Sequence, residues 1–287
     1  MGKRKSLNGA KAETSQSGES GSDEDFDMLD VEFEWFDPQP AYDFHGIKTL
    51  LQQLFDVDAQ LFDLSALTDL ILAQPLLGST VKVDGNETDA YAFLSLINLQ
   101  EHKDKSFVSK IIDYLRQKAA SSSVHSPIAE LLSGPDTPPI ALVLTERLIN
   151  VPSEVTPPMY SMLLEEIQWA LEEKEPYHFS HYLILSKTYT EVVSKLDEED
   201  DRPKKKKKSG GSSPTVLYFH PEDEVFERHA ICHGPYNYST KQDEGHSDSK
   251  RAFQEMGIKP LGHMILVEAE KLEEAVKDIA EYLKSQG

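Results

Sequence analysis

The run IALVL at Ile140–Leu144 decides the fold, because it is short, entirely apolar and free of charge. Such runs are typical of a central strand that is buried on both faces of a sheet. A long helix is expected after Pro157-Pro158, and Phe179–Tyr189 reads as a second strand. Strand, helix and strand in this order favour an α/β sheet with helices packed on its faces.

Two helices are expected upstream of this run. Asp43 can cap the first helix, whose apolar face consists of residues at helical spacing: Ile47, Leu50, Leu51, Leu54 and Phe55. The second helix extends from about Asp63 to Ala73 and ends before Pro75. Gly78 is interpreted as a C-terminal cap of this second helix, which explains the glycine without a ligand.

A hairpin and a third helix follow in the sequence. Thr80–Asp84 and Tyr91–Leu99 read as strands, joined by the turn residues Asp84-Gly85-Asn86. The third helix has an apolar face made of Phe107, Ile111, Tyr114 and Leu115. One further helical turn is expected near Ile128–Leu132.

The composition changes abruptly at Lys195, and residues 196–214 read as a flexible insertion with acidic, lysine-rich and Gly/Ser parts. Beyond it, the expected elements are strands at Thr215–His220 and Gly262–Glu268, and helices at Glu222–Arg228 and Lys271–Leu283. Because strands and helices alternate on both sides of the insertion, we predict a single α/β domain over residues 31–285. Residues 1–30 are expected to form a disordered acidic tail.

The charge balance is strongly acidic. The 287 residues include 50 Asp and Glu against 29 Lys and Arg, which gives a formal net charge of −21. A surface of this charge repels phosphate, so direct binding of nucleic acid is not expected. Basic proteins are the partners that such a surface attracts.

The cysteine count and the hydropathy bear on the compartment. Cys232 is the only cysteine, which excludes an internal disulfide framework and fits a reducing compartment. The sequence lacks an apolar run long enough to span a membrane, and its first residues lack the apolar part of a secretory signal. We therefore expect a soluble intracellular protein.

An acidic arm leads into the domain. It consists of Asp23, Glu24, Asp25, Asp27, Asp30, Glu32, Phe33, Glu34, Trp35 and Phe36. The alternation of Val31, Phe33 and Trp35 predicts that its end adds an edge strand to the domain. A second interpretation makes the arm a docking segment, in which aromatic residues anchor a basic client and carboxylates steer it. The two interpretations are compatible with each other.

Two serines of the tail are candidate phosphorylation sites. Ser20 and Ser22 each have an acidic residue three positions on, Asp23 and Asp25, which is the pattern that acid-directed kinases favour. Phosphate groups there would make the arm still more negative. The alternative is an unmodified tail.

The most specific short signal is the basic run of Arg202, Pro203, Lys204, Lys205, Lys206, Lys207 and Lys208. A compact basic run in a flexible loop can lie extended in the acidic groove of a nuclear import receptor. The alternative is a solvated run of charge paired with the acidic residues at Asp197–Asp201. We predict nuclear import.

The last third of the chain contains the pattern H-x-x-C-H at His229, Cys232 and His233. A structural zinc site commonly uses paired cysteines, and a single cysteine argues against one here. Cys232 and His233 are also poor candidates for a nucleophile and its base, because adjacent residues on a strand point to opposite faces. No nucleophile elbow, phosphate-binding loop or dinucleotide fingerprint occurs. We therefore predict no catalytic residue, no cofactor and no metal.

Several blocks of the sequence resemble the BCCIP/Bcp family of eukaryotic nuclear proteins. They are Val31–Pro38, Asp43–Lys48, Gly78–Lys82, Tyr91–Ser95, Glu146–Pro152 with Pro157-Pro158, His181–Ile184, Phe219–Asp223 and Gly257–Pro260. The resemblance covers roughly residues 30 to 285, with the blocks in the expected order. It implies a fold similar to that of Gcn5-related acetyltransferases, with a central mixed sheet flanked by helices. Gln74–Thr80 is the string nearest to their coenzyme-binding loop, but its spacing is wrong and it has one glycine, so we expect no acetyl transfer.

The resemblance also implies a function. Fungal members of this family are implicated in the nuclear export of a phosphatidylinositol-phosphate kinase, with downstream effects on the actin cytoskeleton and vesicle transport, and in chaperoning a large-subunit ribosomal protein for ribosome biogenesis. The expectation is a non-enzymatic carrier that uses import and export receptors and shuttles between nucleus and cytoplasm. The alternatives are a regulatory adaptor of cell-cycle and DNA-repair proteins and a residual acyltransferase.

Overall fold

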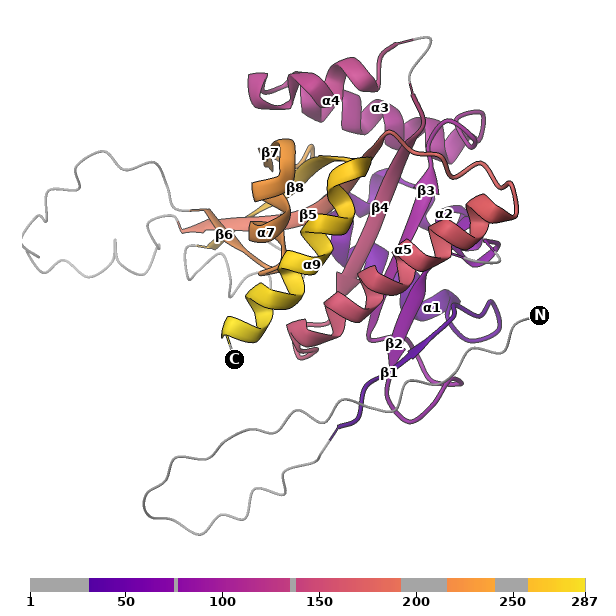
Figure 1. Cartoon of the computed structure of the whole chain (residues 1–287). Coiled ribbons are helices and arrows are strands. Elements are labelled where there is room, and N and C mark those ends of the chain that lie inside the picture. The colour runs from indigo at the N-terminus through magenta and orange to yellow at the C-terminus, as the bar shows by residue number, and fades with distance from the viewer. Residues whose placement is uncertain (1–30, 75–76, 135–137, 192–215, 241–257, 287) are drawn as a thin grey trace, which may run out of the picture.

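The computed structural model describes residues 31–74, 77–134, 138–191, 216–240 and 258–286. These residues form a mixed sheet with helices packed against both of its faces (Figure 1). This arrangement confirms the predicted single α/β domain with a central mixed sheet. The tail at residues 1–30 and the insertion at residues 196–214 lie outside the described residues.

The elements agree with the sequence prediction to within a few residues at most boundaries. The strands are β1 (Glu34–Phe36), β2 (Ser79–Lys82), β3 (Ala92–Asn98), β4 (Ile140–Arg147), β5 (His181–Glu191), β6 (Val216–Tyr218), β7 (Ala230–Tyr236) and β8 (Ile258–Glu268). The α-helices are α1 (Phe44–Phe55), α2 (Leu64–Leu72), α3 (Ser106–Ala120), α4 (Ser126–Leu131), α5 (Thr156–Glu172), α7 (Asp223–His229) and α9 (Ala269–Gln286). Short 3-10 helices are η1 (Asp56–Leu61), η2 (Ser123–His125) and η3 (Ser153–Val155).

The sheet has the strand order β1-β2-β3-β4-β5-β8-β7, with β6 paired to part of β5. The pair β4 and β5 is parallel, and the other described pairs are antiparallel. Helix α5 lies between β4 and β5 in the sequence, as a parallel connection requires. The run at Ile140–Leu144 therefore occupies the middle of the sheet, as predicted.

Two apolar clusters cover the two faces of the sheet. Leu142 and Leu144 belong to the cluster that includes buried residues of α1, α2, α3 and α4. Ala141 and Val143 belong to the cluster on the other face, with α5, α7 and α9. Because successive side chains of a strand alternate, a fully apolar run is what burial on both faces requires.

The hairpin of β2 and β3 is confirmed, with Thr80 opposite Phe93. Its turn places Asp84 at φ 64° and Gly85 at φ 93°. The connection from Lys82 to Ala92 is longer than the tight turn that the sequence predicted, and Asp84 and Gly85 are residue types that tolerate the positive φ values within it.

The predicted role of Asp43 is only partly correct. The residue stands at the N-terminal cap position of α1, but its side chain makes no capping hydrogen bond. Its Oδ1 instead lies 2.7 Å from Lys82 Nζ, and both side chains are fully buried. Because an unpaired buried charge is costly, this carboxylate is held by Lys82 of β2 and by the backbone N–H of Gln39, which donates to Oδ2 at 2.6 Å.

The interpretation of Gly78 as a helix cap is wrong, because α2 ends at Leu72. Gly78 has φ 108°, and a Cβ atom there would lie 2.8 Å from the carbonyl oxygen of Leu94. The glycine is thus needed for a close approach to β3. Its backbone N–H donates a hydrogen bond of 2.7 Å to Glu166 Oε2 on α5.

Candidate functional site

The carboxyl ends of the parallel strands β4 and β5 are the position at which a ligand site is expected in this fold class. The parallel pairing runs from Ile140 opposite His181 to Leu144 opposite Leu185. Both strands continue beyond these pairs, and β5 pairs with β6 at Thr188–Thr190. In α/β proteins, ligands bind in the crevice beyond the carboxyl ends of parallel strands.

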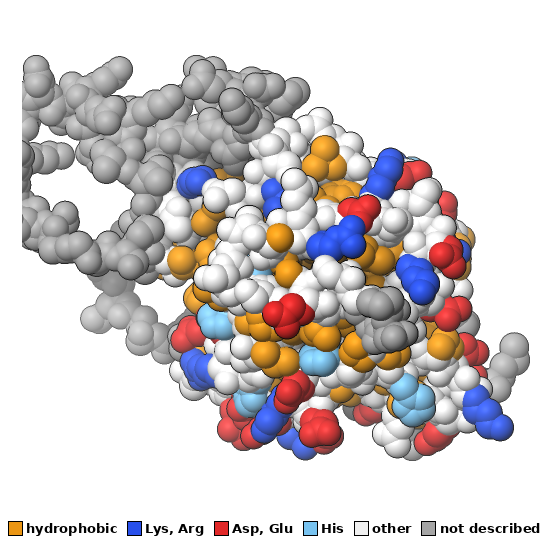
Figure 2. Space-filling model, turned by 90° about the horizontal axis from the view of Figure 1, so that it is seen from above, with side chains coloured by type: hydrophobic (Ala, Val, Ile, Leu, Met, Phe, Trp, Pro, Cys, Tyr) orange, Lys and Arg blue, Asp and Glu red, His pale blue; other side chains and the backbone are white. Residues whose placement is uncertain are grey.

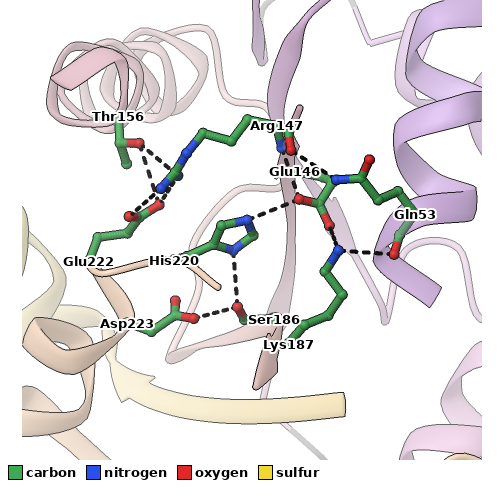
Figure 3. A network of polar contacts seen from close by, with 9 residues as sticks. All are labelled: Gln53, Glu146, Arg147, Thr156, Ser186, Lys187, His220, Glu222 and Asp223. Carbon is green, nitrogen blue, oxygen red and sulfur yellow. Dashed lines mark hydrogen bonds and ion pairs between the residues drawn. The ribbon is translucent and has the colours of Figure 1, made fainter. Parts of the chain in front are cut away.

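Here that region holds a network of the protein's own polar side chains (Figure 3). The network comprises Gln53, Glu146, Arg147, Thr156, Ser186, Lys187, His220, Glu222 and Asp223. They come from α1, β4, α5, β5 and the segment that leads from β6 into α7. The network therefore ties together helices on both faces of the sheet and the two parallel strands.

Glu146 is a central residue of the network. Its Oε2 lies 2.6 Å from Lys187 Nζ, and its Oε1 lies 2.9 Å from His220 Nε2. Burial alone would raise the pKa of Glu146, but the charges of His220 and Lys187 outweigh it and lower this pKa to about 2. Glu146 is therefore an ionised carboxylate held between two cationic partners.

A second ion pair extends the network toward α5. Arg147 donates from both terminal nitrogens to the carboxylate of Glu222, and one of these nitrogens also donates to Thr156 Oγ1 at 3.2 Å. Burial opposes the charge on Glu222, but Arg147 outweighs it and lowers the pKa of this carboxyl group. A planar guanidinium that faces a carboxylate through two bonds fixes both side chains in orientation as well as in charge.

The network also connects to α1. Lys187 Nζ donates a hydrogen bond of 3.1 Å to the backbone oxygen of Gln53, and Gln53 Nε2 donates one of 2.9 Å to the backbone oxygen of Arg147. These two bonds hold the end of α1 against the point where β4 and β5 separate.

Ser186, His220 and Glu146 lie in an order that resembles a nucleophile with its base. Ser186 Oγ is 3.2 Å from His220 Nδ1, but the hydroxyl donates its proton to Asp223 Oδ2. Burial would lower the pKa of His220, yet Glu146 outweighs it and raises this pKa, which favours the charged form of the ring. Ser186 is 2% exposed, and its hydroxyl is bonded to Asp223. The three side chains thus link β4 and β5 to the segment before α7.

Sequence reasoning did not assemble this network. Contacts such as that of His220 with Glu146 join positions 74 residues apart. Five of the nine members do fall in blocks that carried the family resemblance, Glu146–Pro152 and Phe219–Asp223. The charged residues inside those blocks were the available signal.

Of the H-x-x-C-H pattern, Cys232 and His233 point to opposite faces of β7, as predicted, and His229 is the last residue of α7. Cys232 is buried in the apolar cluster with α3 and α4, whereas His233 Nδ1 lies 3.1 Å from Glu227 Oε1. His229 pairs instead with Asp278 of α9, at 2.8 Å. The structure adds His263 to His233 and Glu227, a group that the sequence pattern did not reveal because its members lie on three separate elements.

The end of the acidic arm is an edge strand, as the first interpretation predicted. Glu34–Phe36 forms β1 and pairs antiparallel with β2. Trp35 Nε1 donates a hydrogen bond of 3.2 Å to the backbone oxygen of Val155, and Phe33 and Trp35 pack on the core. These aromatic side chains serve the fold, while the carboxylates of Glu32 and Glu34 are exposed.

The remaining predicted site residues lie outside the described residues. They are the arm residues Asp23, Glu24, Asp25, Asp27 and Asp30, the serines Ser20 and Ser22, and the basic run Arg202–Lys208.

Fold and site together define an α/β protein whose usual ligand-binding edge is filled by its own buried ion pairs. The chain belongs to the BCCIP family, whose model matches residues 28–226. It is 63% identical to Protein bcp1 of Aspergillus fumigatus, over 99% of each chain. It is 46% identical to Protein bcp1 of Schizosaccharomyces pombe, over 90% of this chain and 91% of that one.

A solved structure agrees with this assignment. The crystal structure of BCP1 from Saccharomyces cerevisiae matches with a TM-score of 0.62 and 27% sequence identity. The match covers 94% of this chain and 98% of that chain. The family resemblance inferred from the sequence blocks is therefore confirmed.

Proposed function

We propose that this protein is a non-enzymatic nuclear carrier and chaperone for basic client proteins. The observation that carries the proposal is the formal net charge of −21 on 287 residues. The clients suggested by the family are a ribosomal protein of the large subunit and a phosphatidylinositol-phosphate kinase that leaves the nucleus with the carrier. Effects on the actin cytoskeleton and on vesicle transport would follow from the kinase.

The charge gives a physical basis for both capture and release. A newly made ribosomal protein presents basic RNA-binding surface, which an acidic carrier can cover after fast, electrostatically steered association. Ribosomal RNA is a polyanion that competes for the same cationic groups, so transfer to RNA displaces the carrier.

One described surface suits this role. Glu165, Glu172 and Glu173 of α5 and its C-terminal end are exposed, and Trp169 between them is 43% exposed. Residues three and four positions apart share one side of a helix, so the carboxylates surround the indole. We call this set the α5 acidic surface. By contrast, the face seen in Figure 2 carries acidic, basic, histidine and hydrophobic side chains side by side.

The proposal includes a fold related to that of the acetyltransferases, but without acetyl transfer. Two contacts support the absence of acetyl transfer. Gly78 N–H, the one glycine amide of the nearest loop, is already bonded to Glu166. Ser186 is buried, and its hydroxyl donates a hydrogen bond to Asp223. A calorimetric titration with acetyl-CoA should give no heat of binding, and saturable micromolar binding would contradict this.

The function is tested with purified large-subunit ribosomal proteins as probes, in a fluorescence anisotropy titration. Three forms of the carrier are compared: wild type, a chain without residues 1–30, and a charge-reversed α5 acidic surface (Glu165→Lys, Glu172→Lys, Glu173→Lys). The matched control reverses three exposed carboxylates on the opposite layer: Asp69→Lys, Asp104→Lys and Glu130→Lys. Both triple variants change the net charge equally.

We expect wild type to bind a basic client and the α5 variant to bind it at least tenfold more weakly than the control variant. Equal weakening in the two variants would show that total charge, and not the α5 acidic surface, provides the contact. Failure of wild type to bind any basic client would overturn the proposed function.

Nuclear import by Arg202–Lys208 is a separate element of the proposal. Replacing Lys204, Lys205, Lys206, Lys207 and Lys208 with alanine should move a fluorescently tagged protein from the nucleus to the cytoplasm. Unchanged nuclear enrichment would refute the assignment.

A further inference from the structure

Three side chains outside the buried network converge on one point. Glu227 lies on α7, His233 on β7 and His263 on β8, and one ligand-type atom of each lies within 4.8 Å of the other two. Glu227 Oε1 is 3.1 Å from His233 Nδ1 and 2.9 Å from His263 Nε2. Nothing in the proposed carrier function uses this group.

The fold places these residues with little freedom. In the antiparallel pair of β7 and β8, His233 faces Ile265 and His263 faces Pro235. The two histidines are thus diagonal neighbours on the same face, with ring centroids 6.1 Å apart. Helix α7 comes immediately before β7, and its last turn brings Glu227 over both rings.

The geometry suits a small divalent cation. Zinc binds histidine nitrogens and carboxylate oxygens at about 2.0–2.2 Å, so neighbouring ligand atoms around a tetrahedral ion lie roughly 3.3 Å apart. The distances from Glu227 Oε1 to His233 Nδ1 and to His263 Nε2, 3.1 Å and 2.9 Å, are close to this value. Two histidines and one carboxylate also form a ligand set that zinc uses, with water in the fourth position.

The carboxylate is oriented by a further contact. Tyr218 of β6 donates a hydrogen bond of 2.8 Å to Glu227 Oε2, which leaves Oε1 directed at the two histidines. The carboxylate therefore has a fixed orientation, as a metal ligand should have.

We propose that Glu227, His233 and His263 form a binding site for Zn²⁺, with water as the fourth ligand. His263 is 1% exposed, whereas the His233 side chain is 41% exposed, so the water lies on the side of His233. The ion would join α7 to the β7–β8 pair at the margin of the sheet.

The site should bind more weakly than a closed structural zinc site. A metal-bound His263 Nε2 requires a proton on Nδ1, and this nitrogen is buried without a hydrogen-bond partner in the part of the chain that the structure describes. A hydrogen-bond partner for the second nitrogen of a metal-bound histidine typically raises metal affinity by roughly 10–100-fold. We therefore expect a dissociation constant in the micromolar range.

The competing explanation is a metal-free cluster in which both imidazoles donate protons to Glu227. Both explanations predict that the three side chains lie together. They differ in whether Zn²⁺ binds the full-length protein with a stoichiometry of one ion and in which residues that binding requires.

The test is a competition titration of the full-length protein with Zn²⁺ and a chromophoric chelator. Wild type should bind one Zn²⁺ per chain. His233→Gln should weaken this binding on the order of 100-fold, because it removes a ligand from a half-exposed position, and Tyr218→Phe should weaken it roughly tenfold. His229→Gln is the matched control, since His229 is a nearby histidine at the end of α7 that pairs with Asp278 and not with Glu227. It should bind as wild type does.

Substitution by Co²⁺ provides a second readout. Wild type and His229→Gln should show the visible absorption of a four-coordinate Co²⁺ site, and His233→Gln should not. Lack of Zn²⁺ binding by wild type, or equal binding by His233→Gln and His229→Gln, would overturn the proposal in favour of the metal-free cluster.

Discussion

The carboxylate of Glu146 bridges two cations that come from different parts of the chain. Its partners are Lys187 on β5 and His220 in the turn before α7. All three side chains are nearly inaccessible to water, so each charge depends on the others for its stabilisation. Removing one partner of a buried pair leaves the other charge uncompensated, which costs more than removing both.

Glu146→Gln should therefore destabilise the protein by about 3–5 kcal/mol in urea unfolding near neutral pH. The double variant Glu146→Gln with Lys187→Met should recover part of this loss, because the orphaned ammonium is removed. Glu165→Gln, at an exposed position of α5, is the control and should change stability by less than about 0.5 kcal/mol. A double variant less stable than Glu146→Gln would contradict the interpretation.

The pKa of Asp223 is shifted in the opposite direction to that of Glu146. Burial raises its pKa from 3.8 to about 6, so the folded state holds this proton more strongly than the unfolded state does. The stability that comes from the neutral carboxyl group is complete below about pH 3.8 and is lost as the pH rises through about 6.

Asp223→Asn should remove this dependence, because an amide does not ionise and can still accept the bond from Ser186. Relative to wild type, the variant should gain on the order of 1–3 kcal/mol of unfolding free energy between roughly pH 4 and pH 7. Thermal unfolding across this range is the measurement, with the exposed Asp69→Asn as the control. A difference between Asp223→Asn and wild type that is constant with pH would contradict the assignment.

Among the elements, β1 turns the end of the acidic arm into part of the sheet. Trp35 supplies the contact, through packing on the core cluster with α5 and through its bond to Val155. The neighbouring Glu34 is exposed on the same strand. Trp35 therefore holds β1 against the core, whereas its neighbour Glu34 does not.

Trp35→Ala should destabilise the protein by about 2 kcal/mol, since it removes a partly buried aromatic side chain and its hydrogen bond. Glu34→Ala should leave stability within about 0.5 kcal/mol of wild type. Urea unfolding of both variants tests this. Equal stability of Trp35→Ala and wild type would mean that β1 contributes nothing to the fold in solution.

Elements were predictable where the signal is local. The apolar run of β4 and the spacing of apolar residues in α1 each depend on a few neighbouring residues, and both predictions are confirmed. The pairing of β2 with β3 is also confirmed, although the loop between them is longer than the predicted turn. Asp43 and Gly78 were misjudged because their partners, Lys82 and the backbone of Leu94, are brought to them only by the assembled sheet. Local patterns identify elements, but they do not identify long-range partners.

The site was less predictable than the fold for the same reason. The buried ion pairs join β4, β5 and the start of α7, and the histidine cluster joins three elements that follow the insertion. The cysteine count argued against zinc because it considered sulfur ligands, whereas the group in the structure contains two histidines and a glutamate. Acidic character, in contrast, was readable from composition alone.

For the whole molecule, the important quantity is the imbalance of 50 acidic against 29 basic residues. A chain with this charge repels other acidic proteins and polyanions, and it concentrates cationic partners near its surface. Under the proposed function, the exterior binds the client, while the network at the carboxyl ends of β4 and β5 is buried.

The dependence of client affinity on salt tests this account most directly. The full-length protein is titrated into a labelled basic ribosomal protein at a series of ionic strengths between about 50 and 500 mM, a range over which the screening length shortens severalfold. The account predicts that the dissociation constant rises by at least tenfold across this range. An affinity that does not change with ionic strength would contradict it.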